Sequence, residues 1–469
     1  MNDDSSSRIV DELRTWIATA APGARLASTR TLVRQHEVSP LTVQKALRSL
    51  VALGLVETRP GVGTFVRAPR TSRPHDFGWQ TAALGAPRRQ IPAQSRALQP
   101  VRHDAIAFHS GYPDRDLLPE RLVRSAFTRV ARTDAAIARP PSSGLPELQS
   151  WFAAELAAMT PASVSAPGPQ DVIVVPGNQG GLTACLHALV GAGRPLVIES
   201  PTYWGAIHAA AQAGVELVPI PSGPHGPDPD VLAQALSRSG ARAFYAQPTH
   251  ANPTGARWST QRADAVLAAV REHGAFLIED DWASDFTLTG EATPLAARDD
   301  GGHVVHLRSL TKSVAPSVRV AAVTARGPAH ERILTEVRAA NMYVSGALQA
   351  VALDVVTQPG WRTHLRSMRR ELADRRDLLV AAVSEHLPSA HLTAIPTGGL
   401  NLWIRLPDGT DLGRLTSGCE AKGVLVAPGD EWFPAEPVGA HLRLNYSGPN
   451  PGAFVEGVRL IGATLDEIT

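Results

Sequence analysis

Short apolar runs alternate with alanine-rich segments of helical spacing through the middle of this 469-residue chain. Each run is short and rich in branched side chains, as is typical of strands buried on both faces of a sheet. Strands that alternate with helices return in the same direction, so the pattern predicts an α/β body with a mostly parallel sheet. The runs are DVIVVP (171–176), RPLVIES (194–200), VELVPI (215–220), RAFYAQ (242–247), AFLIED (275–280) and HVVHLRS (303–309).

The chain is too long for one hydrophobic core, so we expect at least two domains. Residues 69–105 carry several prolines and arginines without sustained periodicity, which predicts a linker. The body then spans 106–469. Its later segments GGLNLWIRL, GVLVAPG and HLRLNYS indicate a smaller α+β part. We therefore divide the body into a large part at about 171–335 and a small part formed by about 106–170 and 340–469.

The first 68 residues predict a separate head with three helices and a hairpin. Apolar residues recur at helical spacing over 8–20, and Ser28 is a suitable N-cap for a second helix to His36. Ser39 followed by Pro40 starts a third helix that runs to about Leu53. LVETRPGVGTFV (55–66) reads as two strands around a Pro-Gly turn, so the head is predicted to be a winged helix-turn-helix.

The head is basic although the whole chain has a formal charge of only +1. Residues 25–70 contain eight arginines and lysines against two acidic residues, Glu37 and Glu57, which leaves +6. Such a surface suits DNA phosphates, while the start of the third helix reaches base edges in the major groove. A winged helix used for protein contacts is the alternative. The candidate DNA-binding residues are Arg30, Thr42, Gln44, Lys45, Arg48 and Arg59.

The segment PGARLASTRTLVRQHEVSPLTVQKALRSLVALGLVETRPGVGTFV closely resembles the DNA-binding head of GntR-type regulators. The resemblance implies that Arg30, the start of the third helix and the wing tip contact double-stranded DNA. Pro40 stands where many members of the family carry arginine, and Gln44 stands where some do, which leaves the operator sequence open.

Only three of the 45 basic residues are lysines, namely Lys45, Lys312 and Lys422. A lysine can form an imine with a carbonyl group, whereas arginine stays protonated. Lys312 lies in SLTKSVAPSVR (309–319), directly after a predicted strand, where open α/β sheets bind ligands. Ser309 and Arg319 flank it with groups that suit a phosphate. A solvated surface lysine would give the same local pattern.

Four further motifs lie at strand ends. Asp280, in AFLIEDDW, needs a cationic or protonated partner if it is buried, and a protonated pyridine nitrogen is such a partner. Asn252, in QPTHANPTG, could donate to a ring oxygen, and Tyr203, in ESPTYWGA, could stack on a flat ring. The backbone N–H groups of Asn178 and Gln179 begin a helix and could hold a phosphate. Taken singly, each motif also fits a surface acid, a tight turn or a core aromatic.

Together and in this order, the motifs resemble those of fold-type I aminotransferases over about residues 106–465. The resemblance implies that pyridoxal 5'-phosphate (PLP) forms a Schiff base with Lys312, the catalytic residue. Asp280 would then hold the pyridine nitrogen, Tyr203 would stack on the ring and Asn252 would face the ring oxygen. The phosphate would be held by Asn178, Gln179, Ser309 and Arg319. Arg443, in HLRLNYS, matches the arginine that binds a substrate carboxylate.

The two halves, together with FHSGYPDRDLLPERL (108–122), resemble the MocR subfamily of GntR-type regulators. This resemblance implies a head-to-tail homodimer. Two positions depart from the family pattern. Trp282 replaces a tyrosine that reaches the cofactor's ring oxygen, and Arg139 replaces a tyrosine that reaches the phosphate of the partner subunit.

Two functions follow. The favoured one is a transcription regulator that senses PLP itself, or an amino acid or amine, through imine chemistry at Lys312. The alternative is an active aminotransferase with an accessory DNA-binding head, and a third is a DNA-binding remnant without cofactor. Trp282 modestly favours sensing.

Other classes of protein are disfavoured by the sequence. No apolar run is long enough to span a membrane, and the acidic, polar start MNDDSSSRIV lacks the pattern of a secretion signal. We therefore expect a cytoplasmic protein. Cys185 and Cys419 lack metal-ligand spacing, so we predict buried reduced thiols and no metal site.

Overall fold

The computed structural model describes residues 2–67, 78–84, 95–102 and 104–468. The chain divides into two compact units, Met1–Pro87 and Arg88–Thr469. We call residues 2–67 of the first unit the head and the second unit the body. The position of one relative to the other is not defined, so each is described by itself.

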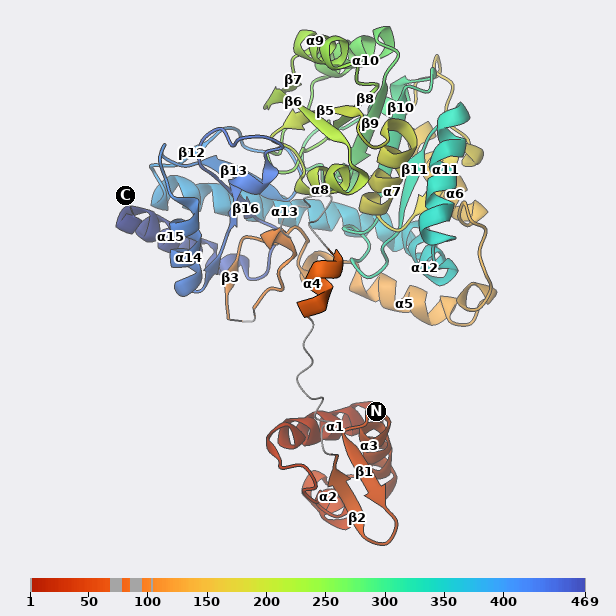
Figure 1. Cartoon of the computed structure of the whole chain (residues 1–469), viewed down its shortest axis with the longest axis vertical. Coiled ribbons are helices and arrows are strands. Elements are labelled where there is room, and N and C mark those ends of the chain that lie inside the picture. Colours follow the sequence, from red (N-terminus) through yellow and green to blue (C-terminus); the bar gives the residue numbers. More distant parts are fainter. Residues whose placement is uncertain (1, 68–77, 85–94, 103, 469) are drawn as a thin grey trace. The chain divides into compact units, whose positions relative to one another are not determined.

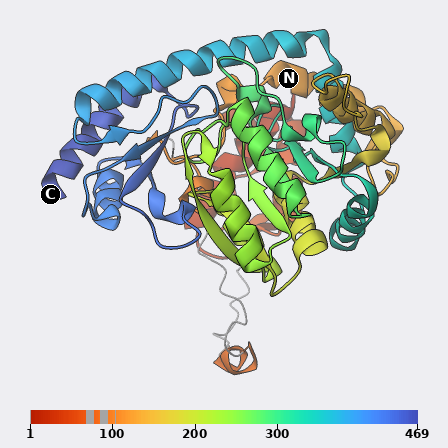
Figure 2. The same ribbon diagram turned by 90° about the horizontal axis from the view of Figure 1, so that it is seen from above.

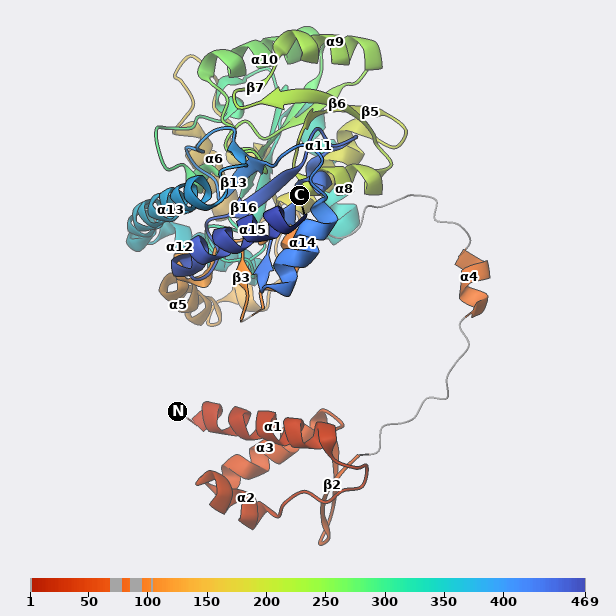
Figure 3. The ribbon, with the colours of Figure 1, turned by 90° about the vertical axis from the view of Figure 1, so that its left-hand side faces the viewer.

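The head has the predicted order of three helices and a hairpin (Figure 3). The side-chain oxygens of Ser28 and Ser39 accept hydrogen bonds from the backbone N–H groups of Thr31 and Thr42, which confirms both predicted N-caps. Pro40 stands in the first turn of its helix, as expected. The first helix begins before residue 8, where the predicted one started. The elements are α1 (Asn2–Thr19), α2 (Thr29–His36), α3 (Pro40–Ala52), β1 (Val56–Arg59) and β2 (Gly63–Val66).

A small core holds the head together. Ile9 and Leu13 of α1 pack with Leu32 of α2 and with Val43 and Leu50 of α3, and Ile9, Val43 and Leu50 are fully buried. β1 and β2 pair antiparallel. The basic side chains are therefore left on the outside of the unit.

The body is built on an eight-stranded sheet of order β4-β11-β10-β9-β8-β5-β6-β7 (Figure 1). All six predicted strands are confirmed, and the run from β10 through β9, β8 and β5 to β6 is parallel. β11 is antiparallel to both of its neighbours. The strands are β4 (Val172–Val175), β5 (Pro195–Ser200), β6 (Glu216–Gly223), β7 (Gly226–Pro227), β8 (Ala243–Ala246), β9 (Phe276–Asp281), β10 (Val304–Ser309) and β11 (Ala321–Thr324).

Helices cover both faces of this sheet. One apolar core joins it to α7 (Asn178–Cys185), α8 (Trp204–Ala213) and α11 (Gly327–Asn341). A second joins it to α9 (Pro229–Ser239) and α10 (Thr260–Glu272). A third joins it to α5 (Glu120–Val130), α6 (Pro146–Ala157) and α12 (Gly346–Thr357). The predicted division of the body is therefore wrong for α5, α6 and α12, because they pack on the large sheet and not in the small part.

The small part contains an antiparallel sheet of order β12-β13-β16-β15. β14 pairs in parallel with β3, which brings the start of the body to the small part. The 28-residue helix α13 extends along the body from the small part (Figure 2). The elements are β3 (Ile106–Ala107), α13 (Pro359–His386), β12 (His391–Leu392), β13 (Asn401–Arg405), α14 (Leu412–Ala421), β14 (Val424–Leu425), β15 (Ala427–Pro428), β16 (His441–Asn445) and α15 (Phe454–Ile468).

Part of the segment predicted as a linker is structured. α4 spans Gly78–Leu84, and residues 95–102 belong to the body. There the Ser95 hydroxyl donates to Glu431 at 2.7 Å, and Ala97 is buried. The body therefore begins before residue 106. The residues at 68–77, 85–94 and 103 lie outside the described part of the chain.

Both cysteines are buried and free, as predicted. In the described part of the chain, no helix has the length and apolar character needed to cross a bilayer. No cluster of three potential metal ligands occurs among the described residues.

Candidate functional site

One cavity lies at the carboxyl ends of the central strands of the body, and its walls include Lys312. All nine residues that the sequence places around the cofactor line it. Three residues that the sequence analysis did not select also line it: Tyr112, Gln247 and Thr311. The nine predicted residues are Asn178, Gln179, Tyr203, Asn252, Asp280, Trp282, Ser309, Lys312 and Arg319.

The topology explains why such distant residues meet. Asn178 follows β4, Tyr203 follows β5, Asn252 follows β8, and Lys312 follows β10, while Asp280 lies near the end of β9. In a parallel sheet these ends share one edge, which is where open α/β sheets bind ligands.

Lys312 is held among aromatic rings. Its Nζ lies 4.0 Å from the ring centroid of Trp282 and 5.9 Å from that of Tyr112. Burial lowers the pKa of its amine to about 7, with a further contribution from the positive charge of Arg443 and an opposing one from Asp280. A large share of the Lys312 side chains is therefore neutral and nucleophilic near pH 7.

Asp280 lies at the bottom of the cavity and is 2 % exposed. Its Oδ2 accepts hydrogen bonds from the Tyr245 hydroxyl at 2.8 Å and from Gln247 Nε2 at 2.9 Å. Its Oδ1 accepts one from Asn178 Nδ2 at 2.5 Å. Burial nevertheless raises the pKa of this carboxyl group, which these donors only partly offset. A protonated ring nitrogen in the cavity would supply the cation that the carboxylate lacks.

Another part of the cavity wall, at the start of α7 and at Arg319, suits a phosphate. α7 begins at Asn178, and both Asn178 and Gln179 line the cavity, so the first N–H groups of this helix are available to a phosphate there. The Arg319 guanidinium donates to the Pro176 carbonyl at 3.2 Å and lies against Gly177. A Cβ at Gly177 would stand 2.8 Å from that guanidinium, so a larger residue there would displace the Arg319 side chain.

Three polar atoms of the residues that line the cavity are buried without a partner in the described structure: Asn178 Oδ1, Thr311 Oγ1 and Trp282 Nε1. Unsatisfied buried polar atoms are uncommon, and a bound ligand is one reason for them. The Ser309 hydroxyl accepts a hydrogen bond from the Thr311 N–H at 3.2 Å. The donors at the start of α7 and at Arg319 fit the phosphate of the cofactor that the sequence implies, and the Asp280 carboxylate fits its ring nitrogen.

Tyr203 and Asn252 are fixed by their neighbours. The Tyr203 hydroxyl donates to Gln179 Oε1 at 3.1 Å, so the Gln179 side chain orients the predicted stacking ring. The Asn252 N–H donates to Gln247 Oε1 at 2.8 Å. Gln247 thus connects Asn252 to Asp280. Gln247 is a residue of the site that the sequence analysis missed, since in the sequence it is only a polar side chain at the end of an apolar strand.

Arg443 does not line the cavity but lies beside it. It is fully buried, and its Nη1 donates to Asn252 Oδ1 at 3.3 Å. Its Nη2 donates to the carbonyl of His109 at 2.6 Å and to that of Ser110 at 3.0 Å. Its Nε has no partner in the described structure, and burial lowers its pKa to about 10. A carboxylate next to Asn252 would pair with this charge.

Two departures noted in the sequence have different surroundings. Trp282 is 6 % exposed, and its Nε1 has no hydrogen-bond partner in the described structure. It therefore places a ring face, and not a hydroxyl group, beside Lys312. Arg139 is exposed and does not line the cavity of its own chain.

The candidate DNA-binding residues lie on the outside of the head. Arg30, Gln44, Lys45, Arg48 and Arg59 are exposed or half-buried on α2, α3 and β1. The Thr42 hydroxyl is 2.9 Å from that of Ser39 and so takes part in the N-cap of α3. The Arg59 guanidinium pairs with Glu57 at 2.6 Å and lies over Phe65. Their contacts with DNA stay predictions.

Comparisons with known proteins agree with both units. Residues 108–451 match the model of aminotransferase class I and II, and residues 5–66 match that of bacterial regulatory proteins of the gntR family. The probable rhizopine catabolism regulatory protein MocR of Rhizobium meliloti is 27 % identical, over 92 % of this chain and 88 % of its own. The 2-aminoadipate transaminase of Thermus thermophilus is 26 % identical, over 83 % of this chain and 98 % of its own.

Solved structures show the same fold in the body. The α-aminoadipate aminotransferase LysN from Thermus thermophilus, complexed with N-(5'-phosphopyridoxyl)-L-leucine, matches with a TM-score of 0.73 and 25 % identity. The match covers 81 % of this chain and 96 % of LysN.

Proposed function

Since the chain belongs to the class I and II aminotransferase family and its head matches the gntR regulators, we propose that it is a PLP-dependent transcription regulator. In this proposal the head binds double-stranded DNA, and the body senses PLP or an amino acid or amine at Lys312. The observation that carries the proposal is the burial of a lysine amine of pKa about 7 beside Trp282 and Asp280, in a chain that also has a basic head.

The cofactor, when bound, supplies an aldehyde with which amines condense and a ring that withdraws electrons when its nitrogen is protonated. The residues of this chain divide the remaining tasks. Lys312 supplies the protein amine, Asp280 holds the proton at the ring nitrogen, and Tyr203 limits the position of the ring. The N–H groups at the start of α7 and the Arg319 guanidinium bind the phosphate.

Arg443 supports selection of a ligand that carries a carboxylate. It is a buried charge, and among the described residues its hydrogen-bond partners are one amide oxygen and two backbone carbonyls rather than a carboxylate. A carboxylate that reaches it gains a charged hydrogen bond out of water. An amino acid thus brings its amine toward Lys312 and its carboxylate toward Arg443.

Sensing requires that the ligand binds two arrangements of the protein unequally. An amine that takes the place of Lys312 frees the lysine side chain and changes its contact with Trp282. We propose a head-to-tail homodimer in which this change alters the spacing of the two heads, since paired heads read paired half-sites. The exposed Arg139 is available on each subunit to serve its partner.

The test combines two measurements on the full cofactor-loaded chain. Common amino acids and amines are screened for a shift of the cofactor's visible absorbance and, in parallel, for a change in DNA affinity. We expect at least one compound to change both. Compounds that shift the spectrum while none alters DNA affinity would reject sensing.

A second candidate function is amino-group transfer, with the head as an accessory. The completeness of the site supports it, since Lys312, Asp280, Asn252 and Arg443 are all present. An assay of transfer from each common amino acid to 2-oxoglutarate separates the two functions. Sustained turnover would favour the enzyme, and a spectral shift without turnover favours the regulator.

A further inference from the structure

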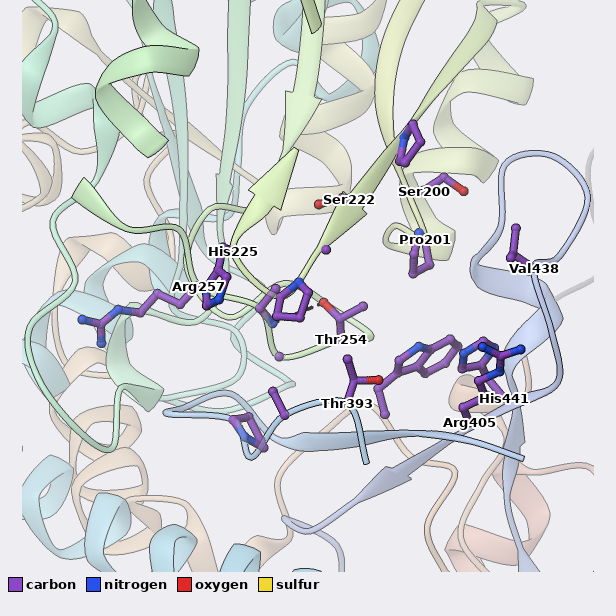
Figure 4. Close-up of a pocket in the computed structure, with 18 of the residues that line it drawn as sticks. Ser200, Pro201, Ser222, His225, Thr254, Arg257, Thr393, Arg405, Val438 and His441 are labelled. Atoms are coloured by element: carbon purple, nitrogen blue, oxygen red, sulfur yellow. Dashed lines mark hydrogen bonds between the residues drawn. The ribbon is translucent and has the colours of Figure 1, made fainter. Parts of the chain in front are cut away.

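A second cavity, which Lys312 does not line, lies between the large and small parts of the body. It measures about 580 Å³, which is within the range of small-molecule sites, roughly 300 to 1,000 Å³. Strand ends of the large part form one wall, at Ser200, Pro201, Ser222 and Thr254. The small part forms the other, at Thr393 and His441 among others (Figure 4). Nothing in the proposed function uses this cavity.

The lining is apolar and aromatic. The rings of Trp403 and His441 stack at 4.8 Å with an interplanar angle of 7°, and Phe433 lies 6.3 Å from Trp403. Four prolines also line the cavity, and one of them, Pro201, is on the wall opposite the small part (Figure 4). Flat apolar molecules bind well against such surfaces.

The charges of the lining have one sign. Arg257 and Arg405 line the cavity together with three histidines, and no aspartate or glutamate does so among the described residues. Arg257 is at one end, beside His225, and Arg405 is at the other, beside His441 (Figure 4). Arg405 pairs with Asp408 at 2.8 Å, but Asp408 is 80 % exposed, and such surface pairs are weak. An anionic group can therefore compete for Arg405.

The cavity is next to the Lys312 site through direct contacts. Trp403 lies opposite Arg443 in the pairing of β13 with β16. The Trp403 ring is 6.0 Å from that of Trp432, over which the Arg443 guanidinium lies at 4.8 Å. In addition, Pro201 is two residues from Tyr203 along the chain, and Thr254 is two residues from Asn252.

We propose that this cavity is a second ligand site, which takes a small aromatic carboxylate and is coupled to the site at Arg443. The flat body binds between Trp403 and Pro201, and the carboxylate pairs with Arg405. A ligand that spans the two parts of the body fixes their separation, so its binding changes the affinity of the Arg443 site for a second ligand. Binding of that second ligand changes the affinity of the cavity for the first ligand by the same factor. The second site goes beyond the proposed function and does not depend on it, while its coupling to a ligand at Arg443 rests on the proposed function.

The test measures the equilibrium binding of indole-3-acetate to the full cofactor-loaded chain by calorimetry. Indole-3-acetate has no amine, so it does not condense with the cofactor. We expect saturable binding. Ile395→Glu places a negative charge at a residue of the lining that is 56 % exposed, and it should weaken the binding about tenfold or more. Arg405→Gln should weaken it about tenfold. Neutral indole should bind about tenfold more weakly than the acid.

The chain offers matched controls on α15. Val455→Glu adds a charge at another exposed apolar residue, and Arg459→Gln removes an arginine that pairs with the exposed Glu456. Both should change the affinity by less than about twofold. No saturable binding, or binding that responds to Arg443→Gln but to neither cavity variant, would overturn the inference. The cofactor spectrum should be retained in both cavity variants. A failure of this inference is then distinguishable from a failure of the proposed function.

Discussion

The amine of Lys312 lies 4.0 Å from the ring centroid of Trp282, so the lysine expected to hold the cofactor is covered by an indole face. Two opposing effects act at this contact. The ring removes water from the amine, which disfavours its charge, and the ring quadrupole attracts a cation. Burial lowers the pKa of Lys312 to about 7, so its surroundings as a whole disfavour the charged amine.

Trp282→Ala should therefore raise the pKa of Lys312 from about 7 toward that of a solvated lysine. Cofactor capture by the cofactor-free protein needs the neutral amine, so its rate rises with pH through this pKa. We expect the midpoint of the rate profile to move to higher pH in the variant. Trp16→Ala, in the head, is the control and should leave the midpoint in place. A midpoint that moves to lower pH would mean that water exclusion by Trp282 is not what sets this pKa.

Asp280→Asn separates cofactor binding from stability. The raised pKa of Asp280 means that its buried charge costs stability above the unfolded pKa, so removing the charge should not weaken the fold near pH 7. The amide also finds a partner, because Asn178 Oδ1 is unpaired in the described structure and its side chain can rotate to accept from it. Cofactor affinity should fall about tenfold to a hundredfold with the loss of a charged hydrogen bond.

Two measurements check this. The free energy of unfolding of the cofactor-free protein, from thermal unfolding, should change by less than about 1 kcal/mol, while the dissociation constant for the cofactor rises. Unchanged cofactor affinity in Asp280→Asn would show that this carboxylate does not hold the ring nitrogen.

Gly177→Ala tests the phosphate end of the site. Gly177 has φ +80°, and an added Cβ would meet the Arg319 guanidinium at 2.8 Å. Gly191→Ala is a matched control, because Gly191 has φ +84° and nothing within 4 Å. Both variants should lose about 1 to 3 kcal/mol of stability from backbone strain. Only Gly177→Ala should also weaken cofactor binding, as measured by equilibrium titration, and equal affinities in the two variants would contradict the placement of Arg319.

Arg30→Ala tests the DNA-binding face of the head. Arg30 is exposed on α2 and is expected to contact a phosphate, so its loss should weaken binding of the full chain to DNA of any sequence. The slope of log affinity against log salt concentration should fall by about 1. Arg14→Ala, exposed on α1, should leave both affinity and slope nearly unchanged. Equal effects of the two variants would place the DNA elsewhere on the head.

The sequence predicted the elements and the lining of the site because both depend on local patterns. Buried strands give continuous apolar runs, and the cofactor residues follow the ends of those runs. The packing of α5 and α6 was not predictable in this way. Their apolar residues require only some buried surface, and the contact with Val172 and Val174 is decided by the topology of the whole sheet.

The residues that the sequence analysis missed act through distant partners. Tyr245 and Gln247 donate to Asp280 from the neighbouring strand β8 and the residue after it, and the pairing of β8 with β9 brings them together. Tyr112 reaches Lys312 from a segment 200 positions earlier in the chain. No spacing in the sequence carries information about such contacts. The structured residues 95–102 likewise lacked a periodic pattern, since they are held by single contacts such as that of Ser95 with Glu431.

The most direct test of the regulator is the effect of amines on DNA affinity in the wild-type chain and in Lys312→Ala, with the cofactor supplied to both. We predict that at least one amino acid or amine changes the DNA affinity of the wild type, and that Lys312→Ala still binds DNA but responds to none of them. An equal response in Lys312→Ala would contradict the assignment of Lys312 as the sensing group.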